Sequence, residues 1–112
     1  MKTIIAGGRD IPFFTIADID FLETMDITEV VCGGATGADE HGKQWAIEAG
    51  IPVKMFEADW KTHGKAAGPI RNRKMAEYAD MLIAFWDGKS RGTKNMIDTA
   101  QEHGLIIHVM RI

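Results

Sequence analysis

Short apolar runs alternate with longer amphipathic segments along this chain. Five runs have the length and composition of buried strands, and they cover residues 3–6, 29–32, 51–56, 81–85 and 105–110. Four segments with helical periodicity lie between them, at residues 15–25, 37–49, 69–79 and 93–103. This alternation is typical of parallel strands joined by right-handed crossovers. The strand runs are mostly continuous apolar stretches rather than alternating apolar and polar residues, which predicts a sheet covered on both faces.

Local signals indicate where the helices begin. Thr15 is typical of an N-cap residue and starts the first helix. Ile16, Ile19 and Leu22 follow it and are expected on one face of that helix. Pro69 suits the first turn of the third helix, where proline loses no intrahelical hydrogen bond. Together these patterns predict an α/β fold, a three-layer Rossmann-like sandwich of about five mainly parallel strands with helices on both faces.

Residues 1–112 are expected to form one domain, because the chain is long enough for a modest core and too short for two. No apolar run approaches the roughly 18 residues of a membrane span, and the N-terminal segment lacks the features of a signal peptide. A single cysteine, Cys32, excludes an internal disulfide and favours a cytoplasmic location. The net charge of −3 gives no overall attraction to nucleic acid or to an anionic membrane.

Glycines and arginines gather in the loops that follow the predicted strands. These loops lie at residues 7–10, 33–37, 58–68 and 86–93. The connections expected at the opposite edge of the sheet have no such cluster of glycines and arginines. In a parallel sheet, ligands bind outside the carboxyl ends of the strands, at the topological switch point. The difference between the two edges therefore predicts a ligand pocket at the carboxyl edge.

The chemistry of these loops favours a phosphate-bearing ligand, although a single glycine loop would equally suit a tight turn. Glycines let backbone N–H groups approach a phosphate, and a helix N-terminus adds partial positive charge. The candidates for bidentate phosphate contacts are Arg9, Arg71 and Arg91. The candidates for stacking on a base are Trp60 and Trp86.

Several common sites are not favoured. The loop after the first strand lacks G-x-G-x-x-G. GKSRGTK departs from the P-loop because its second glycine, Gly92, lies one position too close to Gly88 and is followed by Thr93 instead of lysine. Ser90 is the only serine and no histidine is obviously paired with it, so a serine triad is not expected. Cys32 is interpreted as a small buried side chain. The four histidines show no metal-ligand spacing, and neither a metal nor a cofactor is predicted.

Taken together, the motifs resemble the YspA-type, cpYpsA-related branch of the SLOG superfamily, named for the DNA-processing protein Smf/DprA and the lonely-guy phosphoribohydrolases. The resemblance covers essentially the whole chain and rests on four segments: GGRD, GGATGAD, GPIRNRKM and WDGKSRGT. It implies a Rossmann-like fold, a pocket for a nucleotide or nucleotide-derived ligand, and a homo-oligomer.

Lonely-guy enzymes cleave the N-glycosidic bond of nucleoside monophosphates, with an arginine in R-K-x-x-M and a glutamate in P-G-G-x-G-T-x-x-E. The resemblance places Arg71 on that arginine, but Met96 falls at the glutamate position. Methionine neither stabilises an oxocarbenium-like centre nor activates water. A hydrolase of this kind would need Asp39, Glu40 or Asp87 instead, so hydrolysis is the alternative function and a non-enzyme is preferred.

DprA-like proteins carry S-G-x-A-x-G-I-D after the second strand and an R-N-R segment. Residues 33–39 and 71–73 resemble these two motifs. In that family the region helps to bind single-stranded DNA. The negative net charge and the few aromatic residues do not favour this partner here. Nucleic-acid binding is therefore a lesser alternative.

The preferred hypothesis is a small module that senses or sequesters a nucleotide or nucleotide-derived ligand. Glycines and Thr93 are expected to hold phosphate, and Arg9 and Arg71 to neutralise it. Asp39 is expected to accept a hydrogen bond from a ribose hydroxyl, although Asp39 and Glu40 equally suit the dipole of a helix N-terminus. The predicted ligand-binding residues are Gly7, Gly8, Arg9, Gly33, Gly34, Thr36, Gly37, Asp39, Arg71, Asn72, Gly88, Arg91, Gly92 and Thr93.

Overall fold

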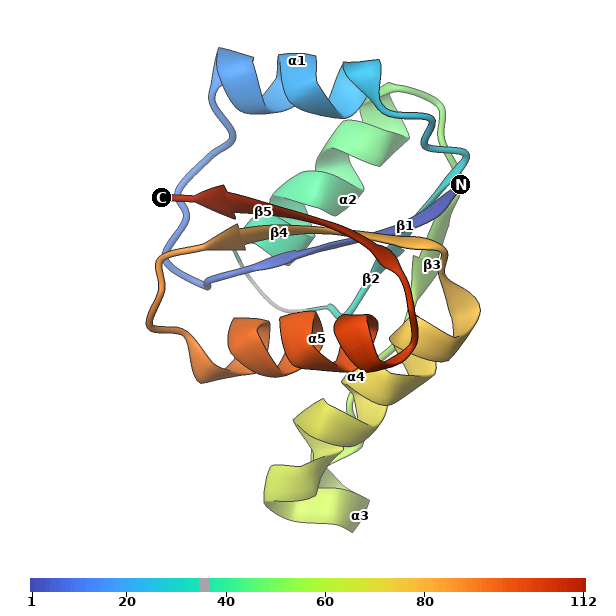
Figure 1. Ribbon diagram of the computed structural model, residues 1–112, viewed down its shortest axis with the longest axis vertical. Helices are drawn as coiled ribbons and strands as arrows, with labels where there is room; N and C mark the ends of the chain where they lie inside the picture. The colour runs from blue at the N-terminus through green and yellow to red at the C-terminus, as the bar shows by residue number, and fades with distance from the viewer. Residues whose placement is uncertain (35–36) are drawn as a thin grey trace.

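The computed structural model describes residues 1–34 and 37–112, and its centre is a five-stranded parallel sheet (Figure 1). The strands are β1 (Lys2–Gly7), β2 (Glu29–Cys32), β3 (Val53–Met55), β4 (Met81–Trp86) and β5 (Ile106–Arg111). Their order across the sheet is β3-β2-β1-β4-β5, with parallel pairing throughout. The α/β fold predicted from the alternation of apolar runs and amphipathic segments is confirmed.

Helices cover both faces of this sheet (Figure 1). They are α1 (Ile16–Thr24), α2 (Ala38–Glu48), α3 (Trp60–His63), α4 (Ala67–Tyr78) and α5 (Arg91–Glu102), with one 3-10 turn, η1 (Gly64–Ala66). On one face, Leu22 of α1 joins Ile5 of β1 in a core cluster with α2. On the other face, Met75 of α4 and Met96 of α5 join Ile4 of β1. Adjacent residues of β1 thus face opposite layers, which explains why both Ile4 and Ile5 are apolar.

One expectation about α1 is wrong. Ile16 is 80% exposed, whereas Leu22 is fully buried. At 3.6 residues per turn, these two positions lie about 120° apart around a helix, so they do not share a face. Thr15 nevertheless caps α1 as predicted, because its side chain accepts a hydrogen bond from the backbone N–H of Asp18 at 3.1 Å. The predicted N-cap of α1 is therefore confirmed, whereas its buried face is narrower than predicted.

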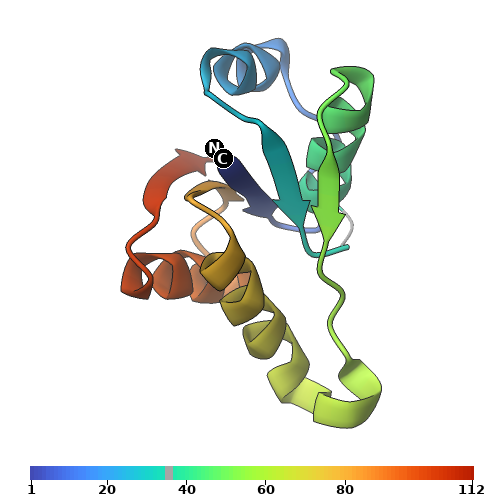
Figure 2. The same ribbon diagram turned by 90° about the vertical axis from the view of Figure 1, so that its right-hand side faces the viewer.

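The polar stretch after β3 folds into a short helix rather than a plain loop. Figure 2 shows the chain leaving the sheet after β3, turning at α3 and returning along α4. The Asp59 carboxylate caps α3 by accepting a hydrogen bond from the backbone N–H of Thr62 at 3.2 Å. Pro69 lies in the first turn of α4, as predicted. Within the described residues, no helix has both the length and the apolar character needed to cross a bilayer.

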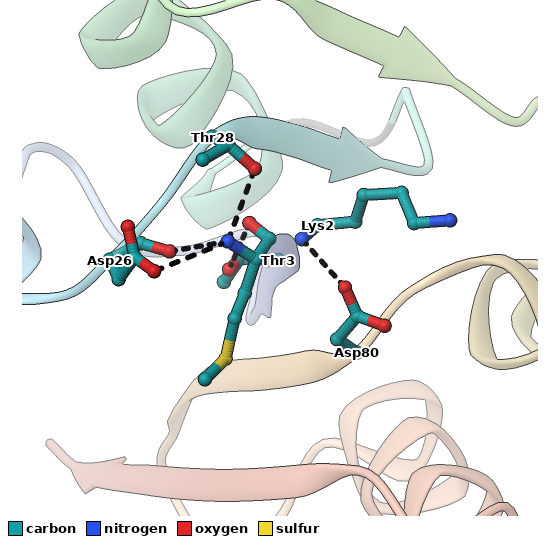
Figure 3. A network of polar contacts seen from close by, with 6 residues as sticks. Lys2, Thr3, Asp26, Thr28 and Asp80 are labelled. Carbon is teal, nitrogen blue, oxygen red and sulfur yellow. Dashed lines mark hydrogen bonds and ion pairs between the residues drawn. The ribbon is translucent and has the colours of Figure 1, made fainter.

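At the amino edge of the sheet, polar groups pair with one another (Figure 3). The amino group of Met1 donates to the carbonyl oxygen of Asp26 at 2.6 Å and to the hydroxyl of Thr28 at 3.1 Å. The backbone N–H of Lys2 donates to Oδ2 of Asp80 at 3.0 Å. The last contact ties the central strand β1 to the residue that precedes β4.

Candidate ligand-binding site

A cavity of about 970 Å³ lies at the carboxyl edge of the sheet, against the ends of β1 and β4. The chain passes from β1 to β2 and β3 on one side, and then to β4 and β5 on the other. The carboxyl ends of β1 and β4 therefore form the switch point, where ligands bind in open α/β folds. The walls of this larger cavity come from the loop after β1, from one side of α4, and from the loop that leads from β4 into α5.

A smaller cavity of about 400 Å³ adjoins the larger one, and Arg9, Trp60 and Arg71 line both. The predicted ligand-binding residues divide between them. Those that line the larger cavity are Gly7, Gly8, Arg9, Asp39, Arg71, Asn72, Arg91, Gly92 and Thr93. Gly33 and Gly34 line the smaller cavity. Gly37 and Gly88 line neither, and Thr36 lies outside the described residues.

Arg71 extends from α4 at the boundary between the two cavities. Its Nη1 donates to the carbonyl oxygen of Gly33 at 2.6 Å, and its Nε donates to Oδ1 of Asn72 at 3.0 Å. A β-carbon at position 33 would lie 2.4 Å from Nη1, so glycine there makes room for the guanidinium. Burial lowers the pKa of Arg71, and the charge of Asp39 acts in the opposite direction. A guanidinium has five N–H donors, which leaves some of them for an anion in either cavity.

Asn72 connects Arg71 to the first turn of α5. Its side chain is only 5% exposed, and its Nδ2 donates to Oδ1 of Asn95 at 3.0 Å and to the carbonyl oxygen of Gly92 at 3.4 Å. Both ends of this buried amide are therefore hydrogen-bonded, as burial requires. Asn95 also lines the larger cavity, and sequence reasoning missed it. The available signal was its spacing of three residues from Gly92 on a helix.

Asp87 and Ser90 shape the loop between β4 and α5. Oδ1 of Asp87 accepts hydrogen bonds from the backbone N–H groups of Lys89 at 2.8 Å and Ser90 at 2.9 Å. These hydrogen bonds lower the pKa of Asp87. Ser90 caps α5, because its Oγ accepts from the backbone N–H of Thr93. Asp87, a candidate for general acid or base chemistry, thus serves as the acceptor that fixes this turn.

Two of the glycines permit close packing of the backbone within the protein. Gly37 has a φ of +76°, and a β-carbon there would lie 2.2 Å from the carbonyl oxygen of Gly8. The next N–H, that of Ala38, donates to this same carbonyl at 3.3 Å. A β-carbon at Gly7 would lie 2.5 Å from the carbonyl oxygen of Phe85. The structure therefore gives both glycines a packing role, and of the two only Gly7 also lines the larger cavity.

Two of the three carboxylate candidates, Asp39 and Asp87, line the larger cavity. Asp39 is 7% exposed, lines the larger cavity and lies close enough to influence the charge of Arg71. Glu40 is exposed and lines neither cavity. Met96, at the position of the lonely-guy glutamate, is 2% exposed, belongs to the core and contributes to the lining of the larger cavity. Of the three substitutes considered for that glutamate, only Asp39 is a buried carboxylate in the cavity wall.

The two candidate stacking residues have different environments. Trp60 is 55% exposed and lines both cavities. Trp86 lines neither, because its Nε1 donates to the carbonyl oxygen of Ser90 at 3.1 Å and its ring lies 5.6 Å from the guanidinium carbon of Arg111. A β-carbon at Gly88, which lines neither cavity, would meet the same guanidinium at 2.6 Å. Trp60 is thus the tryptophan available to a ligand.

The remaining reactive side chains have structural environments. Cys32 is 1% exposed and burial raises its pKa to about 11, in agreement with its interpretation as a buried side chain. Nε2 of His41 lies 2.8 Å from the carbonyl oxygen of Ile11, within the loop that follows β1. Across residues 1–34 and 37–112, no group of three His, Cys, Asp or Glu side chains is arranged to hold a metal ion.

Comparisons with known proteins give three matches. Residues 1–63 match the model of YAcAr, described as the YspA, cpYpsA-related SLOG family. The Gene 61 protein of Mycobacterium phage D29 is 42% identical over an alignment of 82 residues, and the match covers 68% of this chain and 66% of that protein. The X-ray structure of DNA processing protein A (DprA) from Streptococcus pneumoniae has the same fold, with a TM-score of 0.73 at 17% identity. That match covers 96% of this chain but 49% of the DprA chain, so this chain spans about half of its length.

Proposed function

Since this chain belongs to the YspA, cpYpsA-related SLOG family, we propose that it binds a nucleotide or nucleotide-derived ligand in the larger cavity. The observation that carries the proposal is the position of Arg9 and Arg71 in a cavity at the switch point of a parallel sheet. The first turn of α5 faces the same cavity through Gly92 and Thr93. A helix N-terminus and two arginines suit an anionic ligand.

Each wall supplies a different contact. The first turn of α5 binds a phosphate through backbone N–H groups, and Arg71 neutralises it with the donors that Gly33 and Asn72 leave free. The exposed face of Trp60 stacks on a base. Asp39 accepts a hydrogen bond from a ribose hydroxyl. A homo-oligomer and a cytoplasmic location stay expectations from the sequence.

A binding role is preferred to hydrolysis because Met96 lies in the core at the glutamate position. The observation that favours the hydrolase alternative is Asp39, a buried carboxylate in the cavity wall beside Arg71. Turnover of AMP followed by chromatography, lost in Asp39→Ala and kept in Glu40→Ala, would establish that alternative. Steeply salt-dependent binding of single-stranded DNA, without binding of any small nucleotide, would favour a nucleic-acid partner instead.

Isothermal titration calorimetry of AMP, ADP and ADP-ribose with the wild-type protein and with Arg71→Ala tests the proposal. Loss of a charged hydrogen-bond donor is expected to weaken binding roughly 10- to 100-fold. Mass spectrometry of small molecules released from the purified protein would identify the ligand that it carries.

The matched control is Arg73→Ala, because Arg73 lies on the same helix, is exposed and lines neither cavity. Its removal changes the net charge by the same amount, so Arg73→Ala is expected to keep wild-type affinity. Equal losses in the two variants, or an unchanged affinity in Arg71→Ala, would contradict the assigned site.

A further inference from the structure

The two cavities share three lining residues. Arg9, Trp60 and Arg71 line both, so a ligand that extends from the larger cavity into the smaller one passes two guanidinium groups and an indole. Two arginines shared by both cavities suit an anionic linkage, such as a diphosphate, in the middle of a ligand. The boundary therefore divides a ligand into two parts on opposite sides of its charged centre.

The smaller cavity has one carboxylate in its lining, that of Glu57. Its remaining lining residues are Gly33, Gly34, Glu57 and Ala58. Glu57 is exposed, and no hydrogen bond or ion pair joins it to another residue in the described part of the chain. An ionised carboxylate only accepts hydrogen bonds, so Glu57 offers acceptor oxygens to the hydroxyl groups of a ligand.

An indole beside a free carboxylate suits a sugar. The indole face of Trp60 offers an apolar surface to the C–H face of a sugar ring, while Glu57 accepts hydrogen bonds from its hydroxyls. A volume of about 400 Å³ lies within the range of roughly 300–1,000 Å³ that ligand pockets have.

We propose that the smaller cavity is a sugar subsite, so that the ligand is a nucleoside diphosphate joined to a second sugar. The nucleoside lies in the larger cavity, the diphosphate crosses the boundary at Arg9 and Arg71, and the sugar contacts Trp60 and Glu57. This inference rests on the proposed function, because it extends a nucleotide already bound in the larger cavity.

Calorimetry with two matched pairs of probes, ADP with ADP-ribose and UDP with UDP-glucose, isolates the contribution of the sugar. In the wild-type protein, the sugar is expected to raise affinity about tenfold in at least one pair, as one charged hydrogen bond would. In Glu57→Ala this gain is expected to disappear, while the affinity for ADP or UDP alone stays the same or rises as a negative charge is removed. Glu77→Ala is the control, because Glu77 is an exposed acid on α4 outside both cavities.

The outcomes separate the two proposals. Binding of ADP and ADP-ribose with equal affinity, and of UDP and UDP-glucose likewise, would overturn the sugar subsite and leave nucleotide binding standing. Tighter binding of ATP than of any sugar-bearing probe would assign the smaller cavity to a further phosphate and overturn the inference. A protein that binds none of these probes would contradict the proposed function and, with it, the subsite.

Discussion

The amino and carboxyl edges of the sheet use their polar groups in opposite ways. At the amino edge the partners are other groups of the chain, as in the hydrogen bond from the backbone of Lys2 to Asp80. At the carboxyl edge, Arg71 and Asn72 are hydrogen-bonded on one side and line a cavity on the other. Substitutions at the amino edge should therefore change stability, and those at the carboxyl edge should change ligand binding. Glycines that pack against neighbouring backbone at the carboxyl edge are exceptions, because their substitution should change stability.

The largest effect is expected for Gly37→Ala, which should lower the free energy of unfolding by about 3 kcal/mol or more. The alanine would combine a left-handed φ of +76° with a β-carbon 2.2 Å from a backbone oxygen that has little freedom to move. Urea unfolding measures this change. The control is Gly50→Ala, whose φ is +74° but whose β-carbon would meet no atom within 4 Å. Gly50→Ala should cost only about 1 kcal/mol, and equal costs would show that the contact with Gly8 is unimportant.

A smaller effect, on binding rather than stability, is expected for Gly33→Ala. Its β-carbon would displace the flexible end of Arg71, so the free energy of unfolding should change by less than about 1 kcal/mol. The affinity for ADP should nevertheless fall about tenfold, because the guanidinium is no longer held at the boundary.

The double variant Gly33→Ala/Arg71→Ala tests this explanation by calorimetry. It should bind no more weakly than Arg71→Ala alone, since both changes remove the same contact. Additive losses would contradict the idea that Gly33 acts through Arg71.

The smallest effect is expected for Asp80→Ala at the amino edge. Loss of the hydrogen bond from the backbone of Lys2 should lower the free energy of unfolding by about 1 kcal/mol and leave the affinity for ADP unchanged. Asp80→Asn keeps an acceptor oxygen and should recover most of the stability. A loss of affinity in Asp80→Ala, measured beside its urea unfolding curve, would break the distinction between the two edges.

The fold could be predicted from the sequence because the strands lie in short, mostly apolar runs bounded by turn residues. A run such as residues 81–85 has one stable position, in the interior of a covered sheet. The prediction that Ile16 lies on the buried face of α1 was wrong, because an apolar residue in the first turn of a helix need not face the core. The short helix within residues 58–68 was not predicted, because it is too short to show a helical periodicity in the sequence. It is stabilised by its N-cap, Asp59.

The position of the cavity could also be predicted, but the task of each residue in it could not. The sequence does not distinguish a glycine that makes room for a ligand, as Gly92 is proposed to do, from one that makes room for a neighbouring backbone, as Gly37 does. Trp60 and Trp86 were equal candidates until the hydrogen bond of Trp86 to its own loop separated them. Asn95 was missed because its role depends on an amide from another helix, which one sequence does not place.

The pairing of β1 with β4 has a consequence for how the chain folds. Lys2 and Asp80, which meet beside this pair, are 78 positions apart. The loops after β1 and β4, which line the cavity, come together only when this distant pairing has formed. Pairings between residues far apart in the sequence form slowly. A ligand that touches both walls would recognise only the finished sheet. It should therefore slow unfolding while leaving the rate of folding almost unchanged.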